Sequence, residues 1–274
     1  MMLLSTSFDP WAVRRAEPAS GAWILAAAIV LSLVAVGVAV EVHSGAARDL
    51  GRAIASAGVH CGLLAAGWIM TAGRGAPWGP LIRVTGSLCL ASVATWWNAW
   101  GALFYLIPPV LLAHEGGRSP AFRSIGLNAR AGLRYLPYGL VAGTFLGVHL
   151  LVSASMTLGY SARVGSLGHY LSAVAYDVGA NALTAEWLFR GALFSRWWRR
   201  WEFWPAAGLA TALVVCRYLL DPALPLAIEV RAGAVLYMLV LGFSACALRA
   251  ISGSLLPGYL ATVAFFAAYR TLAQ

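Results

Sequence analysis

An acid and a base lie four residues apart inside a strongly apolar stretch, TAEWLFRGALFSRWWRR (residues 184–200). On a helix, Glu186 and Arg190 share one face and can form an ion pair. A lone charge in lipid is costly, whereas a paired charge that faces other helices is tolerated. The spacing therefore allows two interpretations. Either the pair only holds helices together, or Glu186 activates water or binds a ligand while Arg190 orients it.

A second carboxylate, Asp177, precedes Glu186 by nine residues. Nine residues of α-helix rotate by about 900°, which places the two carboxylates on opposite faces. We therefore expect Asp177 and Glu186 not to form a shared acid/base dyad. Asp177 shares a face with Asn181 instead, and we expect both to hydrogen-bond to a neighbouring helix.

The segment AEWLFRGALFSRW resembles the first motif of the CAAX-protease and bacteriocin-processing (CPBP, or Abi) family, Glu-Glu-x-x-x-Arg, commonly with Phe before and Gly after the arginine. The resemblance covers about residues 126–269. SIGLNARAGLRYLPYGLVAG is similar to the family's lead-in, and ALRAISGSLLPGYLATVAFFAAY resembles the segment after its Gly-Ser-Leu-x-x-Pro turn. The family consists of polytopic α-helical intramembrane endopeptidases, so the resemblance implies an all-α membrane fold.

The first motif departs from the family pattern at its leading position. The glutamate that the family uses to activate water falls on Ala185. Glu186 and Arg190 match the second glutamate and the arginine, and they are the catalytic candidates if the chain is active. Glu186 is rotated by about 100° from Ala185 on a helix, so it does not simply replace the missing base.

The second and third motifs depart further. Phe-x-x-x-His falls on Leu213 and Arg217, and His-x-x-x-Asn falls on Thr262 and Phe266. The resemblance therefore implies that the water-holding histidines and the oxyanion-stabilising asparagine are missing. Arg217 cannot act as a base because it stays protonated, and Asp221 four residues later is its expected ion-pair partner.

These departures favour a non-catalytic relative, or pseudoenzyme, that acts as an accessory or scaffold subunit for other membrane proteins, including pigment or cofactor proteins. One alternative is an active endopeptidase that cleaves prenylated or transmembrane peptides with Glu186 and unidentified helpers. The other is a small-molecule transporter or lipid-handling protein, for which a helix interrupted at Pro108 and Pro109 is suitable.

His60, in AGVHCGLLAAG, is the best candidate ligand for a haem or chlorophyll-type pigment, because its small neighbours leave room for a macrocycle. The alternative for this lone histidine is a hydrogen-bonding role in the core, and no cofactor is required by the sequence. The cysteines show no CxxC spacing and are expected to be buried thiols, so we expect no metal site. They are Cys61, Cys89, Cys216 and Cys246.

The composition places these residues in a membrane. The chain is 61% hydrophobic and 11% charged, with a mean hydropathy of +0.76, whereas soluble domains carry about 25% charged residues. All 19 cations are arginines, and the net charge is +9. They lie between apolar runs, which favours lipid headgroups over nucleic acid as partners. We expect an integral protein of the bacterial inner (plasma) membrane that contacts other membrane proteins.

The apolar runs predict a polytopic bundle of about eight transmembrane helices. An interfacial segment (1–20) precedes an N-terminal region of about three spans (21–115) and a CPBP-like region of about five spans (126–270). The expected spans are 21–40, 53–73, one from about 84, 136–158, 169–194, 204–220, 232–248 and 255–269. Gly139 and Gly143 are spaced for close contact between helices.

Overall fold

A computed structural model describes residues 34, 38–39, 48–72, 78–118, 126–127, 132–219 and 228–273. The expected interfacial segment and nearly all of the expected first span therefore lie outside the described residues. Within them the fold is all-α, as the sequence predicts. The exception is an antiparallel pair of two-residue strands, in which Ser161 of β1 (Ser161–Ala162) pairs with Ala273 of β2 (Leu272–Ala273).

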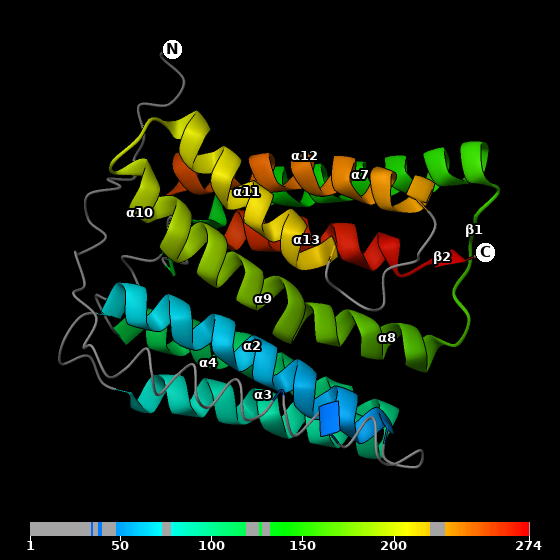
Figure 1. Ribbon diagram of the computed structural model, residues 1–274, viewed down its shortest axis with the longest axis horizontal. Coiled ribbons are helices and arrows are strands. Elements are labelled where there is room, and N and C mark those ends of the chain that lie inside the picture. Colours follow the sequence, from blue (N-terminus) through cyan, green and yellow to red (C-terminus); the bar gives the residue numbers. More distant parts are fainter. Residues whose placement is uncertain are drawn as a thin grey trace.

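The helices form three layers (Figure 1). One outer layer contains α2 (Arg48–Ala72), α3 (Gly79–Trp97), the 3-10 helix η4 (Ala99–Leu106) and α4 (Ile107–Arg118). The other contains α7 (Leu136–Leu158), α11 (Phe203–Leu219), α12 (Ile228–Ser252) and α13 (Leu256–Tyr269). A single long helix crosses the molecule between these layers, so its side chains meet helices on both sides.

This middle element, the central helix, carries the charged motif. It consists of α8 (Leu167–Tyr176), a π-helical turn η5 (Asp177–Asn181), α9 (Ala182–Ala185), a π-helical segment η6 (Glu186–Phe194) and α10 (Ser195–Trp198). In a π-helix the hydrogen bonds run from i to i+5, so each turn holds more residues than the 3.6 of an α-helix. The rotation per residue in these segments is therefore smaller than the roughly 100° of an α-helix.

The expected number of about eight spans is wrong for the described residues. Three helices are long and apolar enough to cross a membrane, namely Arg48–Met70, Leu136–Leu158 and Arg231–Ser252. α11 and α13 are apolar but have 17 and 14 residues. At 1.5 Å per residue they reach about 26 and 21 Å, less than a hydrocarbon core of roughly 30 Å. The central helix lacks a long uncharged run because Asp177, Glu186 and Arg190 interrupt it.

The break after α3 differs from the one expected at the prolines. α3 ends at Trp97. The side chain of the next residue, Asn98, accepts a hydrogen bond from the backbone of Trp100 and caps the start of η4. Pro108 and Pro109 instead lie in the first turn of α4. Proline is compatible with a first helical turn, because the amide hydrogens there have no partner within the helix.

The close approach of α7 to α13 depends on two glycines, as their spacing predicts. A Cβ atom at Gly139 would overlap the carbonyl oxygen of Pro257, and one at Gly143 would overlap that of Ala261. Both obstacles are backbone atoms, so they cannot rotate away. The small residues therefore set the distance between α7 and α13.

We predict that Gly143→Ala lowers the free energy of unfolding by about 1–3 kcal/mol, because the added methyl group forces α7 away from α13. Thermal unfolding in detergent micelles measures this change. The matched control is Gly86→Ala on α3, where nothing lies within 4 Å of an added Cβ. Equal stability of the two variants would contradict the proposed role of Gly143.

Candidate functional site

The carboxylate of Glu186 lies in the interior and is held from two sides. Its Oε1 accepts a hydrogen bond of 2.9 Å from Thr262 Oγ1 on α13. The Nη1 atom of Arg190 lies 3.4 Å from the same oxygen, and both charged residues are 2% exposed. The ion pair suggested by the four-residue spacing therefore forms, although π-helical geometry makes it longer than a good charge-assisted hydrogen bond.

The other carboxylate oxygen, Glu186 Oε2, has no hydrogen-bond partner among the described residues. It faces Gly258, where an added Cβ would lie 3.1 Å away. A larger residue at position 258 would therefore crowd this oxygen. A buried acceptor without a partner is energetically costly, so a water or a ligand group would be favoured at Oε2.

The positions that depart from the family pattern have different surroundings. Ala185 is fully buried in an apolar cluster that also contains Phe266. The ring of Phe266 packs against that of Tyr218, with centroids 5.2 Å apart. Only Thr262 reaches Glu186, whereas Arg217 bonds elsewhere on the central helix. At position 185, where the family pattern has a glutamate, an alanine packs among apolar side chains.

A second polar cluster surrounds Asp177. Arg270, just after α13, donates from Nε and Nη2 to the two carboxylate oxygens of Asp177, each over 2.8 Å. Asn181 Nδ2 donates to Asp177 Oδ1 over 2.9 Å, and Arg217 Nη1 donates to Asn181 Oδ1 over 2.8 Å. As expected, Asp177 and Asn181 bond to neighbouring helices. Asp221, the partner expected for Arg217, lies outside the described residues.

The expected opposite placement of Asp177 and Glu186 is wrong. Both carboxylates bond side chains that come from α13 or its end, Arg270 and Thr262. The π-helical turns explain the difference, because nine residues make about 2.5 turns of α-helix but fewer turns in wider π geometry. The role of Arg270 as the partner of Asp177 was not predicted from the sequence. The only indication in the sequence is that Arg270 directly follows the last apolar run.

His60 connects α2 to the central helix. Its Nδ1 lies 2.9 Å from Thr184 Oγ1, and its Nε2 lies 2.8 Å from the hydroxyl of Tyr176. The residue is buried. Both ring nitrogens are therefore engaged within the protein, and ligation of a haem or chlorophyll metal would require one of these bonds to break. The pigment hypothesis stays a prediction.

The thiols differ in exposure. Cys246 and Cys61 are buried and Cys89 is half-buried, but Cys216 is exposed on α11, contrary to expectation. The sulfur atoms of Cys61 and Cys89 lie 3.8 Å apart between α2 and α3. Across the described ranges, no three side chains of His, Cys, Asp or Glu converge as metal ligands would.

A further buried arginine, Arg249 on α12, was not anticipated from the sequence. Its Nη2 lies 3.4 Å from Ser195 Oγ on α10. Its guanidinium packs against Gly126, which has a positive φ of 101° and leaves no room for a Cβ. The carbonyl of Gly126 accepts from the backbone of Leu255 over 2.8 Å. The segment that resembles the family's lead-in is thereby attached to the turn before α13.

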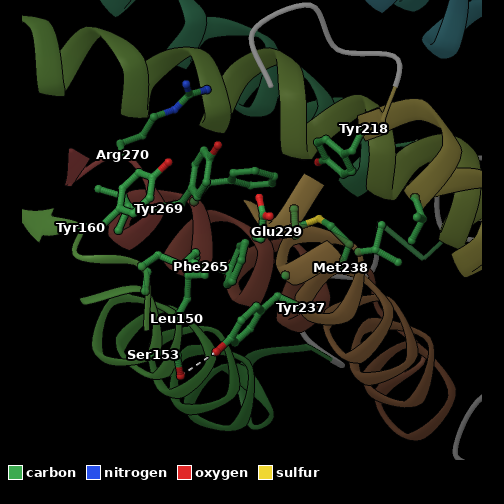
Figure 2. A pocket seen from close by; sticks show the side chains of 18 of the residues that line it. Leu150, Ser153, Tyr160, Tyr218, Glu229, Tyr237, Met238, Phe265, Tyr269 and Arg270 are labelled. Carbon is green, nitrogen blue, oxygen red and sulfur yellow. Dashed lines mark hydrogen bonds between the residues drawn. The ribbon is translucent and has the colours of Figure 1, made fainter. Parts of the chain in front are cut away.

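A cavity with a mostly apolar wall lies beside the second cluster. The cavity, of about 300 Å³, opens between α7, α11, α12 and α13, and Asn181 and Arg270 border it. Figure 2 shows its aromatic wall, with Arg270 on one side, and the exposed Glu229 also lines the cavity. Glu186 is not among the residues that line it. The candidate catalytic acid and the cavity are therefore separate features.

Comparison of the chain with protein-family models, with curated proteins and with solved structures gives no match.

We predict that Arg190→Leu lowers the free energy of unfolding by about 3–5 kcal/mol, because it leaves the buried Glu186 carboxylate without its cation. Thermal unfolding of the purified protein measures the loss. The matched control is Arg52→Leu, which removes an exposed partner of Asp49 (the Arg52 side chain is 62% exposed) and should change stability by less than about 1 kcal/mol. Wild-type stability of Arg190→Leu would rule out a structural role for the pair.

Proposed function

We propose that this protein is an integral protein of the bacterial inner membrane that retains a CPBP-like helical scaffold without cutting peptides, and that it serves as an accessory or scaffold subunit for other membrane proteins. The observation that carries the proposal is the environment of Glu186. Its Oε1 is engaged by both Thr262 and Arg190, and the neighbouring Ala185 is buried in hydrocarbon.

Peptide hydrolysis requires a base beside a water and donors aimed at the developing oxyanion. The Thr262 hydroxyl already donates to Glu186, so it is not available to an oxyanion in this arrangement. Phe266 contributes only a ring to the apolar cluster. Loss of one oxyanion donor costs about 100- to 1,000-fold in rate, and several groups are replaced here. These considerations favour a structural role for the charged motif.

The accessory role is supported by an exposed aromatic surface on α3 and η4, the tryptophan surface. It consists of Trp96, Trp97, Trp100, Leu103 and Phe104. Trp97 is 83% exposed. Tryptophan is enriched both at membrane–water interfaces and in the centres of protein interfaces. A surface of this composition is suited to contact with another membrane protein at the edge of the bilayer.

The alternative function is an active intramembrane endopeptidase, and one observation favours it. Glu186 Oε2 has no hydrogen-bond partner among the described residues and could accept a bond from water. An enzyme of this kind would need further donors that the positions of Thr262 and Phe266 do not supply.

A protease assay in liposomes, with prenylated and transmembrane peptides, distinguishes the two functions. We expect no cleavage by the wild-type protein, by Glu186→Gln or by Ala185→Glu, because restoring one carboxylate does not restore the oxyanion donors. Glu186→Gln keeps the shape of the side chain and removes its basicity. Cleavage by the wild type that is lost in Glu186→Gln would establish the endopeptidase and reject the proposal.

The accessory role is tested by gentle purification from membranes followed by mass spectrometry. We expect a membrane protein to co-purify in a fixed ratio, and Trp97→Ala together with Trp100→Ala to reduce its recovery by roughly tenfold or more, as at interface hot spots. The matched control is Trp204→Ala on α11, because the exposure of Trp204 lies between those of Trp97 and Trp100. Purification of the chain alone, or equal loss in the control, would contradict the role of the tryptophan surface.

A further inference from the structure

The cavity between α7, α11, α12 and α13 has the size and the mostly apolar lining of a small-molecule site. Its volume of about 300 Å³ is at the small end of the range for ligand pockets, which are mostly apolar with a few polar groups. Aromatic and aliphatic side chains form most of the wall, among them Leu150, Met238, Phe265 and Phe266. Figure 2 shows Leu150, Met238 and Phe265 turned toward a common space.

One polar group in this wall has an unused hydrogen-bonding capacity. Tyr218 is 7% exposed, and its hydroxyl has no hydrogen-bond partner among the described residues. The hydroxyl of Tyr237, in contrast, is bonded to His149 Nδ1 over 2.6 Å and to Ser153 Oγ over 3.2 Å. Since a buried hydroxyl without a partner is unfavourable, a ligand oxygen beside Tyr218 would be stabilised.

The charges around the polar end of the cavity balance. Arg270 lines it but is engaged by both oxygens of Asp177, and Arg217 is bonded to Asn181. Glu229 lines it as an exposed residue at the start of α12. The two charged residues that line the cavity, Arg270 and Glu229, therefore have formal charges that sum to zero. Burial of an ionic head group without a counter-charge is costly, so the balance favours an uncharged ligand.

The cavity also has a gradient of polarity along the helices. Its rim includes Leu158 at the end of α7 and Glu229 near the beginning of α12, the ends of two helices that can span a membrane. The buried floor, with Leu150, Tyr237 and Phe265, lies further along these helices. A spanning helix places its ends at the interface and its middle in hydrocarbon. The rim therefore suits a polar head and the floor an apolar chain.

We propose that this cavity binds one molecule of an uncharged single-chain amphiphile, with a hydroxyl or ester head beside Tyr218 and an apolar chain against Leu150 and Phe265. Binding would supply the partner that the Tyr218 hydroxyl lacks and would fill the aromatic space. This site is independent of the proposed accessory role, since it contains neither Glu186 nor the tryptophan surface.

The test uses the full chain in phosphatidylcholine nanodiscs and a monoacylglycerol with a diazirine in its acyl chain. We expect saturable photolabelling at cavity residues of α7 and α12, located by mass spectrometry. Unlabelled 1-oleoylglycerol should compete at a concentration roughly tenfold lower than oleate or oleyltrimethylammonium, because the ionic heads are not matched by a counter-charge. Labelling that does not saturate, or stronger competition by either ion, would overturn the proposal.

Two variants tie the binding to this cavity. Gly233 lines it and has open space around an added Cβ, so Gly233→Trp should fill it and abolish the labelling. Gly86→Trp, at an equally open helical glycine on α3, is the matched control and should label as the wild type does. Tyr218→Phe should weaken competition roughly fivefold through loss of one hydrogen bond. Equal labelling of Gly233→Trp and Gly86→Trp would reject the cavity as the site.

Discussion

The ion pair between Glu186 and Arg190 constrains the rest of the architecture. Removing two charges from water costs several kcal/mol for each ion, and only good geometry with further hydrogen bonds recovers that cost. The pair alone is 3.4 Å long, so the hydrogen bond from Thr262 is part of what makes the charges tolerable. The central helix must therefore be enclosed, and α13 must hold Thr262 in register with it.

Polar bonds of this kind position the other helices as well. His60 joins α2 to Thr184, Arg217 joins α11 to Asn181, and Arg270 joins the end of α13 to Asp177. Apolar packing alone discriminates poorly between neighbouring registers in lipid, because lipid tails are as apolar as the side chains. Each of these hydrogen bonds forms only when the two helices that it joins are in the right register. The charged and polar residues of the central helix thus orient the layers on both sides of it.

The same geometry separates two features that a catalytic site would combine. A hydrolytic site needs its base, its oxyanion donors and its substrate space in one place. Here Glu186 lies in the interior, while the cavity is beside Asn181 and Arg270. The space beside Ala185 is filled by the apolar cluster. This separation is the physical basis of two proposals, that the charged motif is structural and that the cavity binds a ligand.

The sequence alone determined the helical class and the limits of several elements. The run predicted at residues 136–158 coincides with α7. The run at 204–220 differs from α11 by one residue at each end, and the run at 255–269 begins one residue before α13. Such agreement is expected, because apolar backbone in lipid must satisfy its own hydrogen bonds and does so as a helix. The four-residue spacing of Glu186 and Arg190 was likewise enough to predict their pairing.

The number of spans, the faces of the central helix and the partners of its charges depend on how the helices pack. Apolar runs of 14 and 17 residues can be buried against other helices without crossing a bilayer, so composition overestimated the spans. The π-helical turns reduce the rotation between Asp177 and Glu186, and the residue pattern did not predict these turns. Arg270 is 93 residues from Asp177, and His60 is 124 residues from Thr184. Contacts over such separations depend on how the helices pack, which local spacing does not contain.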